Sequence, residues 1–497
     1  MSKVKLSAKA KTAKEAGAPI EAFCEVIRGG HALGADGKPM KKLVAVIGLW
    51  CHALHGEDQR EELFKAAGIL AGVHTLLEKG NMEDRHAAMG CLVALAASEK
   101  HFMDVVTHRV ISTATAQLLG EHLRSKLPAS QMLALAAARS EFGARVSDAA
   151  LPALVGVLKS GAPGWAQTRG TQLYAAQALK SLVQNVEGDA PDVRQLRRLH
   201  AVQLGVVPGL VSLVAYAPRL PDPPVVPACI NVLFPGVGGK RSGKKKSASK
   251  GAGEVPLGQK DIIATVAAAC LRCLALVPEF VDHLMGCGGL PALAHCLLSA
   301  NEEQAAHLTG VLWELAAEPE VSHAVVACHS VTLLLHVIAR SISSVPSRRR
   351  ARAKAGVKPQ AKGARPPRGE QGEALRPINF HDVAVCNATG ALHHLTFDDA
   401  AKAQVGAVPG GCAILAECLK AGNPQTYENA VGALWNVGLD AANAEALLHA
   451  QAPSFVTHPV PAAWMTQRVV ISGEGFDRPA ATDGSFLTQQ YNEKLFP

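Results

Sequence analysis

Aromatic residues are scarce in this sequence: Trp, Tyr and Phe make up 4% of the chain, although 48% of its residues are hydrophobic. The apolar content is therefore mainly Ala, Leu and Val. Ala and Leu favour helices, whereas β-sandwiches and barrels depend on aromatic and β-branched residues. The composition predicts an all-α protein, and 497 residues are enough for several cores or one extended array.

Long apolar runs are also missing. No run reaches the roughly 18 residues of a membrane-spanning helix. The first residues, MSKVKLSAKAKTAKEAG, contain no apolar core of a signal peptide. We therefore expect a soluble, cytoplasmic protein without a transmembrane segment, whose 12 cysteines are mostly small buried residues.

The motifs of enzyme chemistry are absent as well. The sequence has no GxSxG, HExxH or P-loop, and no GxGxxG between a strand and a helix. The CxxC pair of Cys270 and Cys273 lies in AACLRCLAL, whose helical apolar pattern favours core packing over a zinc site. We therefore expect a protein that is not an enzyme and has no cofactor. His393, His394, Asp398 and Asp399 cluster at one helix end, where we expect them to form a turn and not a metal site.

One nine-residue pattern occurs three times: GVLWELAAE at 310–318, GALHHLTFD at 390–398 and GALWNVGLD at 432–440. Each copy ends a longer unit made of apolar helices and polar turns. Equivalent turn residues are 41 apart from Gly68 to Arg109, from Gly288 to His329 and from Gly410 to Gln451. A helical period near 40 residues is typical of an α-solenoid, and we count eight repeats with a partial ninth after Gln451.

Two longer spacings contain extra chain. Residues 218–258 and 341–377 are rich in Pro, Gly, Lys and Arg, and their basic parts have no helical apolar period. We predict two long disordered inserts there, a basic tail at 1–15 and a solenoid over 16–452.

The repeats resemble the armadillo family. Its unit runs Gly-x-(Ile/Leu)-Pro-x-Leu, a helix, a polar turn and Ala-Leu-x-Asn-Leu, and the matches are GGLPALAHCL, AALPALVGVL (149–158), GVVPGLVSLV (205–214) and GALWNV. The resemblance implies a right-handed α-solenoid of armadillo/HEAT-like repeats. It also implies a concave groove in which the Asn binds the backbone of an extended peptide.

In this chain the residue at the position of that Asn varies from repeat to repeat. It is Asn436 once, and elsewhere it is Glu314, His394, Ser181, Cys273, Ala94 and Ala53. The repeated framework is therefore interpreted as structural, and the varied residue as the place where binding is tuned. The alternative is that Glu314 and His394 are only solvated. We expect Glu314→Ala with Asn436→Ala to weaken partner binding at a nearly unchanged melting temperature.

Four residues before this position, the nuclear-import adaptors of the family have Trp, which forms slots for lysine. Here that position is Gly432, Gly310, Gly390 or Gly90. Trp313 and Trp435 instead lie one residue before the varied position, about 100° round the helix. The pattern is closer to the catenin-like branch, and both Trp residues are interpreted as packing or partner contacts.

Charge is divided unevenly. The basic stretches 1–14, 240–250 and 348–368 hold 20 of the 50 Lys and Arg residues, which leaves 30 basic against 42 acidic residues elsewhere. The basic loops could bind nucleic acid, an anionic membrane or acidic tubulin tails, fold back on the acidic body, direct nuclear import or only solvate the chain. Their candidate residues are Lys240, Arg241, Lys244, Lys245, Lys246, Arg348, Arg349, Arg350 and Arg352.

The last residues, 453–497, have no helical period but hold six of the 21 aromatic residues. Disordered tails are usually poor in aromatics. We predict an extended segment that docks on the solenoid or on a partner through Trp464, Phe476, Phe486, Tyr491 and Phe496. Together these features predict a protein-binding scaffold, plausibly in a cytoskeletal or ciliary axonemal assembly, with a nuclear transport adaptor and a nucleic-acid binder as alternatives.

Overall fold

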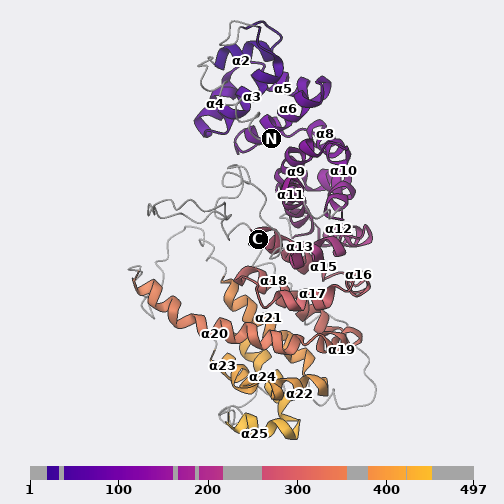
Figure 1. Cartoon of the computed structure of the whole chain (residues 1–497), viewed down its shortest axis with the longest axis vertical. Coiled ribbons are helices and arrows are strands. Elements are labelled where there is room, and N and C mark those ends of the chain that lie inside the picture. Colours follow the sequence, from indigo (N-terminus) through magenta and orange to yellow (C-terminus); the bar gives the residue numbers. More distant parts are fainter. Residues whose placement is uncertain are drawn as a thin grey trace. The chain divides into compact units, whose positions relative to one another are not determined.

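The computed structural model describes residues 20–32, 39–159, 166–184, 190–216, 260–354, 379–420 and 423–449, which form helices joined by short turns. The chain divides into two compact units, Met1–Cys270 and Leu271–Pro497, and the boundary falls inside one helix. In both units the helices follow one another as stacked repeats (Figure 1). The prediction of an all-α solenoid is confirmed.

Unit 1 contains the first repeats. The first described repeat has two helices, and most of the others have a short first helix, a second helix and a long third helix. In the fourth repeat a single helix takes the place of the first two. The helices are α2 (Ile20–Ile27), α3 (Lys42–Ala53), α4 (Glu57–Lys65), α5 (Ile69–Lys79), α6 (Met82–Leu95), α7 (Phe102–Val105), α8 (His108–Leu119), α9 (Leu123–Ala137), α10 (Ser140–Lys159), α11 (Ala166–Val183), α12 (Pro191–Gln203), α13 (Val207–Tyr216) and α15 (Lys260–Leu274), which crosses into unit 2.

Unit 2 contains three complete three-helix repeats and one further helix in the position of a first helix. These are α16 (Glu279–Gly286), α17 (Gly289–Cys296), α18 (Glu302–Ala317), α19 (Pro319–Ala327), α20 (Ser330–Lys354), α21 (Phe380–Leu395), α22 (Asp399–Ala407), α23 (Gly411–Cys418), α24 (Pro424–Gly438) and α25 (Ala441–His449).

The turn between the first and second helices explains the marker residues of the repeat. Gly68, Gly205, Gly288 and Gly410 adopt left-handed backbone conformations with φ between 62° and 79°, and His329 does so with φ 57°. Glycine has no Cβ and reaches this region without strain, so the recurring Gly fixes the corner. Arg109 is an exception, because it lies inside α8 and does not form such a turn.

Short polar side chains begin the helices. Asn301 and Asn423 accept hydrogen bonds from Gln304 N and Gln425 N at the starts of α18 and α24. Asp398 accepts one from Ala400 N at the start of α22. Each cap satisfies an amide that has no partner within its own helix. The turn-forming role expected for Asp398 is thus confirmed.

The prediction of a disordered insert at residues 341–377 is wrong in part. Helix α20 continues to Lys354, so residues 341–354 do not belong to an irregular insert. Ala, Arg and Lys are good helix formers, and the run SRRRARAK therefore extends the helix although it lacks an apolar face. This places four of the predicted loop residues on helical backbone: Arg348, Arg349, Arg350 and Arg352.

Other predicted segments lie outside the described residues. They are the basic tail 1–15, the first insert with Lys240, Arg241, Lys244, Lys245 and Lys246, and the C-terminal segment with Trp464, Phe476, Tyr491 and Phe496. Across the described parts of the chain, no single helix is long and apolar enough to span a membrane, although two bent pairs, α12 with α13 and α19 with α20, meet the criterion when each pair is taken together.

Candidate functional site

The third helices carry a recurring contact between adjacent repeats. A bulky side chain on one third helix lies against a glycine on the next third helix: Trp50 against Gly90, Arg272 against Gly310, Trp313 against Gly390, and His393 against Gly432. A Cβ added at Gly390 would lie 2.5 Å from the Trp313 ring. The glycine in the repeated motif is therefore required because a neighbouring side chain occupies the space that a larger residue would need.

This contact also sets the register of the first repeats. Trp50 occupies the same place against Gly90 as Trp313 does against Gly390. By this contact Cys51 follows Trp50 as Glu314 follows Trp313. The glycine of the same helix, Gly48, lies against Phe23 and places His52 four residues on, so neither contact supports Ala53. Ala53 and Ala94 are both buried, at 0% and 3% exposure, so neither can contact a partner. Ser181 and Cys273 are half-buried on α11 and α15.

Glu314 does not lie unpaired in solvent. Its carboxylate accepts a hydrogen bond of 2.6 Å from Nη1 of Arg272, which also donates to the Gly310 carbonyl at 2.9 Å. The side chain of Arg272 is only 9% exposed and that of Glu314 is 25% exposed. The pair therefore joins α15 to α18. For the double variant Glu314→Ala with Asn436→Ala, we accordingly expect a lower melting temperature in place of the nearly unchanged one predicted from the sequence.

Asn436 is likewise used inside the protein. It is 7% exposed, and its amide nitrogen donates to the His393 carbonyl and to Oγ1 of Thr396, both at 3.3 Å. These bonds hold α24 against the C-terminal end of α21. Two similar hydrogen bonds join successive third helices nearer their N-terminal ends. The amide of Asn387 donates to Ala306 O, and the amide of Asn429 donates to Cys386 O.

His393 and His394 are stacked side chains on α21, with ring centroids 5.7 Å apart. Burial, with a smaller contribution from the neighbouring His394, lowers the pKa of His393 to about 4. Burial also lowers the pKa of His394, although the Glu314 carboxylate opposes this. Both rings are therefore neutral at pH 7 and can offer one hydrogen-bond donor and one acceptor each.

The low pKa of His393 predicts a pH-dependent stability. An unfolded His takes up a proton near pH 6.5, while the folded ring resists it down to about pH 4. The free energy of unfolding should therefore fall as the pH drops between these values, by about 1–2 kcal/mol from pH 7 to pH 5. Urea titrations at both pH values measure this change. His393→Gln should reduce the pH dependence. Equal slopes in the wild type and in this variant would contradict the assignment.

Three exposed side chains lie at or just beyond the C-terminal ends of α21 and α24. Together with His393 and His394 they form what we call the third-helix surface of unit 2. Phe397, Trp435 and Leu439 are 56%, 43% and 65% exposed. Phe397 follows His394 by three residues, as Leu439 follows Asn436, and its ring lies 5.8 Å from that of His393. Sequence reasoning missed Phe397 and Leu439, although the aligned copies GALHHLTF and GALWNVGL place them at the same position.

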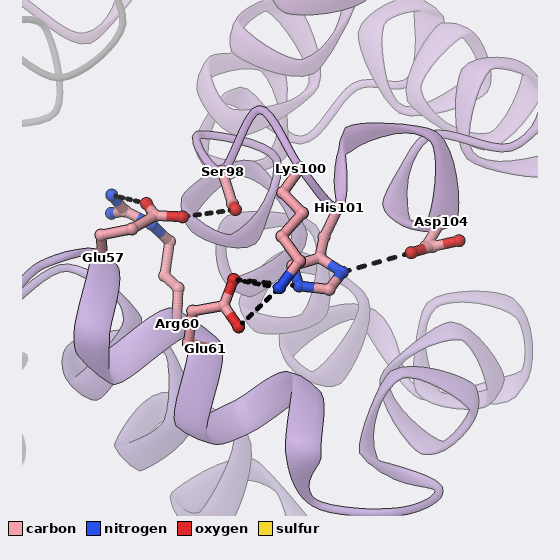
Figure 2. A network of polar contacts seen from close by, with 7 residues as sticks. All are labelled: Glu57, Arg60, Glu61, Ser98, Lys100, His101 and Asp104. Carbon is pink, nitrogen blue, oxygen red and sulfur yellow. Dashed lines mark hydrogen bonds and ion pairs between the residues drawn. The ribbon is translucent and has the colours of Figure 1, made fainter.

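A polar network joins the first helices of unit 1 (Figure 2). The Glu57 carboxylate accepts a hydrogen bond from the Ser98 hydroxyl and forms an ion pair with Arg60. The hydrogen bond from Ser98 is the main cause that lowers the pKa of Glu57. Glu61 pairs with Lys100 and His101. The network connects α4 to the turn before α7, so its partners come from adjacent repeats. We interpret it as a structural clamp, like the His323–Asp398 pair between α19 and the start of α22.

The cysteines and the acidic pair also have structural surroundings. Cys270 is fully buried, and its thiol donates to the Ala176 carbonyl, which confirms core packing for this residue. Asp399 pairs with Lys402 in the first turn of α22. Within the described ranges, no group of three or more His, Cys, Asp or Glu residues is arranged to hold a metal ion.

Comparisons with known proteins address the fold. No family model matches the sequence, and no curated protein matches it. A solved structure concerning the phosphorylation-controlled interaction of cadherin and β-catenin is 16% identical, with a TM-score of 0.53, over 83% of this chain and 61% of that one. An engineered protein is 18% identical, with a TM-score of 0.51, over 80% and 74% of the two chains.

A designed armadillo repeat protein is 18% identical, with a TM-score of 0.39, over 55% of this chain and 93% of its own. At 16% and 18% identity, the likeness to the β-catenin structure and to the engineered protein is one of fold, and it agrees with the three-helix repeats described above.

Proposed function

The chain has an armadillo-repeat fold, and we propose that it is a non-enzymatic scaffold that binds a protein segment along the third-helix surface of unit 2. The observation that supports this most directly is the exposure of Phe397, at 56%, next to the neutral rings of His393 and His394. Aromatic side chains bordered by hydrogen-bonding groups are common at protein-binding surfaces. Glu314 and Asn436 support this surface from within the protein.

The chemistry of this surface favours a partner segment with apolar and hydrogen-bonding side chains. Arg272 and Glu314 neutralise each other, so Glu314 offers no free carboxylate to a strongly basic segment. The glycine positions are filled by side chains of the preceding repeat, and they offer no lysine slots of the kind found in import adaptors. A nuclear transport adaptor is therefore the less favoured alternative.

The setting of this scaffold is a second part of the proposal. The basic stretches 240–250 and 348–368 suit an acidic surface such as tubulin tails, and a cytoskeletal or ciliary assembly remains our proposal for it. Nucleic-acid binding through the same residues is the alternative. It predicts binding that weakens steeply with salt whatever residue occupies position 397.

The test is recovery of partners from the native cell with the tagged full-length chain. Phe397→Ser should lose most of the wild-type partners, because it removes an exposed ring without opening a cavity in the core. Leu298→Ser is the matched control, since Leu298 is 45% exposed beyond the second helix α17. Equal recovery by both variants, with loss on deleting 240–250 or 348–368, would place binding in the basic segments.

A further inference from the structure

Several third helices end in an exposed apolar residue at a fixed distance from the contact with the next repeat. It comes four positions after the side chain that packs on a glycine of that repeat, in three pairs: Trp50 and Leu54, Trp313 and Ala317, His393 and Phe397. Leu439 holds the same place as Phe397 at the end of α24. Leu54, Phe397 and Leu439 are 44%, 56% and 65% exposed, and Ala317 is exposed as well. An apolar residue therefore recurs at this edge in three successive repeats of unit 2.

Carboxylates follow these residues directly in unit 2. They are Glu318 and Glu320 after Ala317, Asp398 and Asp399 after Phe397, and Asp440 after Leu439. Asp398 pairs with His323, and Asp399 pairs with Lys402. Among the residues that the structure describes, Glu318, Glu320 and Asp440 form no ion pair. The ends of α18, α21 and α24 add partial negative charge, because the last carbonyls of a helix point outward there. This edge is therefore acidic.

The corresponding edge in unit 1 is largely neutralised. Beyond α3, Glu57 pairs with Arg60, and Glu61 pairs with Lys100 and His101 (Figure 2). The two edges thus share an exposed apolar residue after the third helix but differ in the charge beside it. Unit 1 therefore supplies a matched control for unit 2.

The asparagines inside α21 and α24 decide which kind of segment suits the acidic edge. Asn387, Asn429 and Asn436 are buried, and their amide nitrogens donate to carbonyls of the preceding repeat. These amides are therefore not available to the backbone of an extended peptide, whose N–H and C=O groups need partners. A helix satisfies its backbone groups internally. The edge is thus suited to a helical segment.

We propose that the edge formed by Ala317, Phe397 and Leu439 binds an amphipathic helix of a partner protein, with Lys and Arg residues flanking its apolar stripe. Adjacent packed helices lie about 8–10 Å apart, and seven residues of a helix rise about 10.5 Å. Apolar residues at i and i+7 of the partner therefore match Phe397 and Leu439, and its basic residues meet Glu318, Glu320 and Asp440. This partner class rests on the function proposed above and narrows it.

Fluorescence anisotropy with the full-length protein and a labelled peptide tests this edge. The probe is a peptide of Leu, Ala and Lys, about 18 residues long, with Leu at every third or fourth position so that one helix face is apolar. Leu439→Ser should raise the Kd of the probe about tenfold. Leu54→Ser, the matched change in unit 1, should alter it by less than about twofold. Equal Kd values for these two variants would overturn the proposal.

The charge is tested by Glu318→Gln with Glu320→Gln and Asp440→Asn. Asn keeps an oxygen for the hydrogen bond that Asp440 accepts from Ala442 N. This triple variant should also raise the Kd about tenfold and should flatten its dependence on salt. An unchanged Kd and an unchanged salt dependence would overturn the basic character of the partner.

The shape of the partner is tested with the probe itself. A peptide of the same composition with its leucines scattered round the helix should bind about tenfold more weakly, and equal affinity would mean that charge alone drives the contact. Circular dichroism should show that the probe gains helix on binding; a bound probe without helical signal would overturn the proposal. Binding that appears only after deletion of residues 348–368 would assign the edge to the chain's own basic stretch and would overturn it too.

Failure of this proposal is distinguishable from failure of the proposed function. If Phe397→Ser loses the native partners but the wild-type protein does not bind the probe, the scaffold function stands and the basic amphipathic helix is wrong. If the probe binds at Leu439 as expected but Phe397→Ser recovers all native partners, the edge binds such helices and the proposed function is wrong.

Discussion

Leu434→Asp should unfold the C-terminal repeats while the N-terminal helices remain folded. Leu434 is 8% exposed on α24, and this helix packs against α21. A carboxylate there would be buried without a partner, and the apolar contacts of the leucine would be lost, so we expect a cost of about 4–5 kcal/mol. Because repeats couple mainly to their neighbours, unit 1 should keep its helical signal.

Circular dichroism during thermal unfolding measures this effect. The variant should lose part of its helical signal at a lower temperature, in a separate transition. Leu298→Asp provides the control, because Leu298 is 45% exposed and a carboxylate there stays in water. An unchanged melting curve for Leu434→Asp would show that this side chain does not lie in the core between the third helices.

Glu314→Ala should also destabilise unit 2 strongly. It leaves the guanidinium of Arg272, which is 9% exposed, without its carboxylate partner. Leaving one member of a buried ion pair without its partner is more costly than losing an exposed pair, and we expect about 2–4 kcal/mol. Urea unfolding monitored by circular dichroism gives the value.

An exposed ion pair in the same unit supplies the control. Glu417 and Lys420 have side chains that are 49% and 69% exposed, so Glu417→Ala should change the stability by less than about 0.5 kcal/mol. Replacing both members of the buried pair, with Arg272→Met and Glu314→Leu, should recover at least half of the loss. A loss of stability that is equal for Glu314→Ala and Glu417→Ala would mean that Arg272 is solvated.

Much of the fold could be predicted from local patterns. The period near 40 residues, the Gly corner and the Ala- and Leu-rich helices depend on interactions within a repeat. The structure contains them where the sequence placed them, apart from the turn expected at Arg109, which lies inside α8. The second insert shows the limit of that reasoning. Its basic run lacks an apolar period, but helix propensity does not require one, and α20 continues to Lys354.

The candidate site was less predictable. A helical period fixes the direction of Glu314 on its own helix, but the residue that neutralises it, Arg272, lies 42 positions earlier in the chain. Asn436 is bonded to His393 and Thr396 from the preceding repeat in the same way. Neither contact has a signal in the local sequence, because an armadillo repeat leaves open which side chain its neighbour presents.

The sequence by itself therefore determined that this chain is an α-solenoid, where its repeats turn, and that its glycines and leucines form a constant framework. Only the tertiary structure decided which varied residues remain available to a partner. In the folded chain Asn436 is buried and Glu314 is paired with Arg272, whereas Phe397 remains exposed. The physical reason is that exposure depends on the packing of adjacent repeats, which brings together residues about 40 positions apart, whereas helix and turn formation depend on residues only a few positions apart.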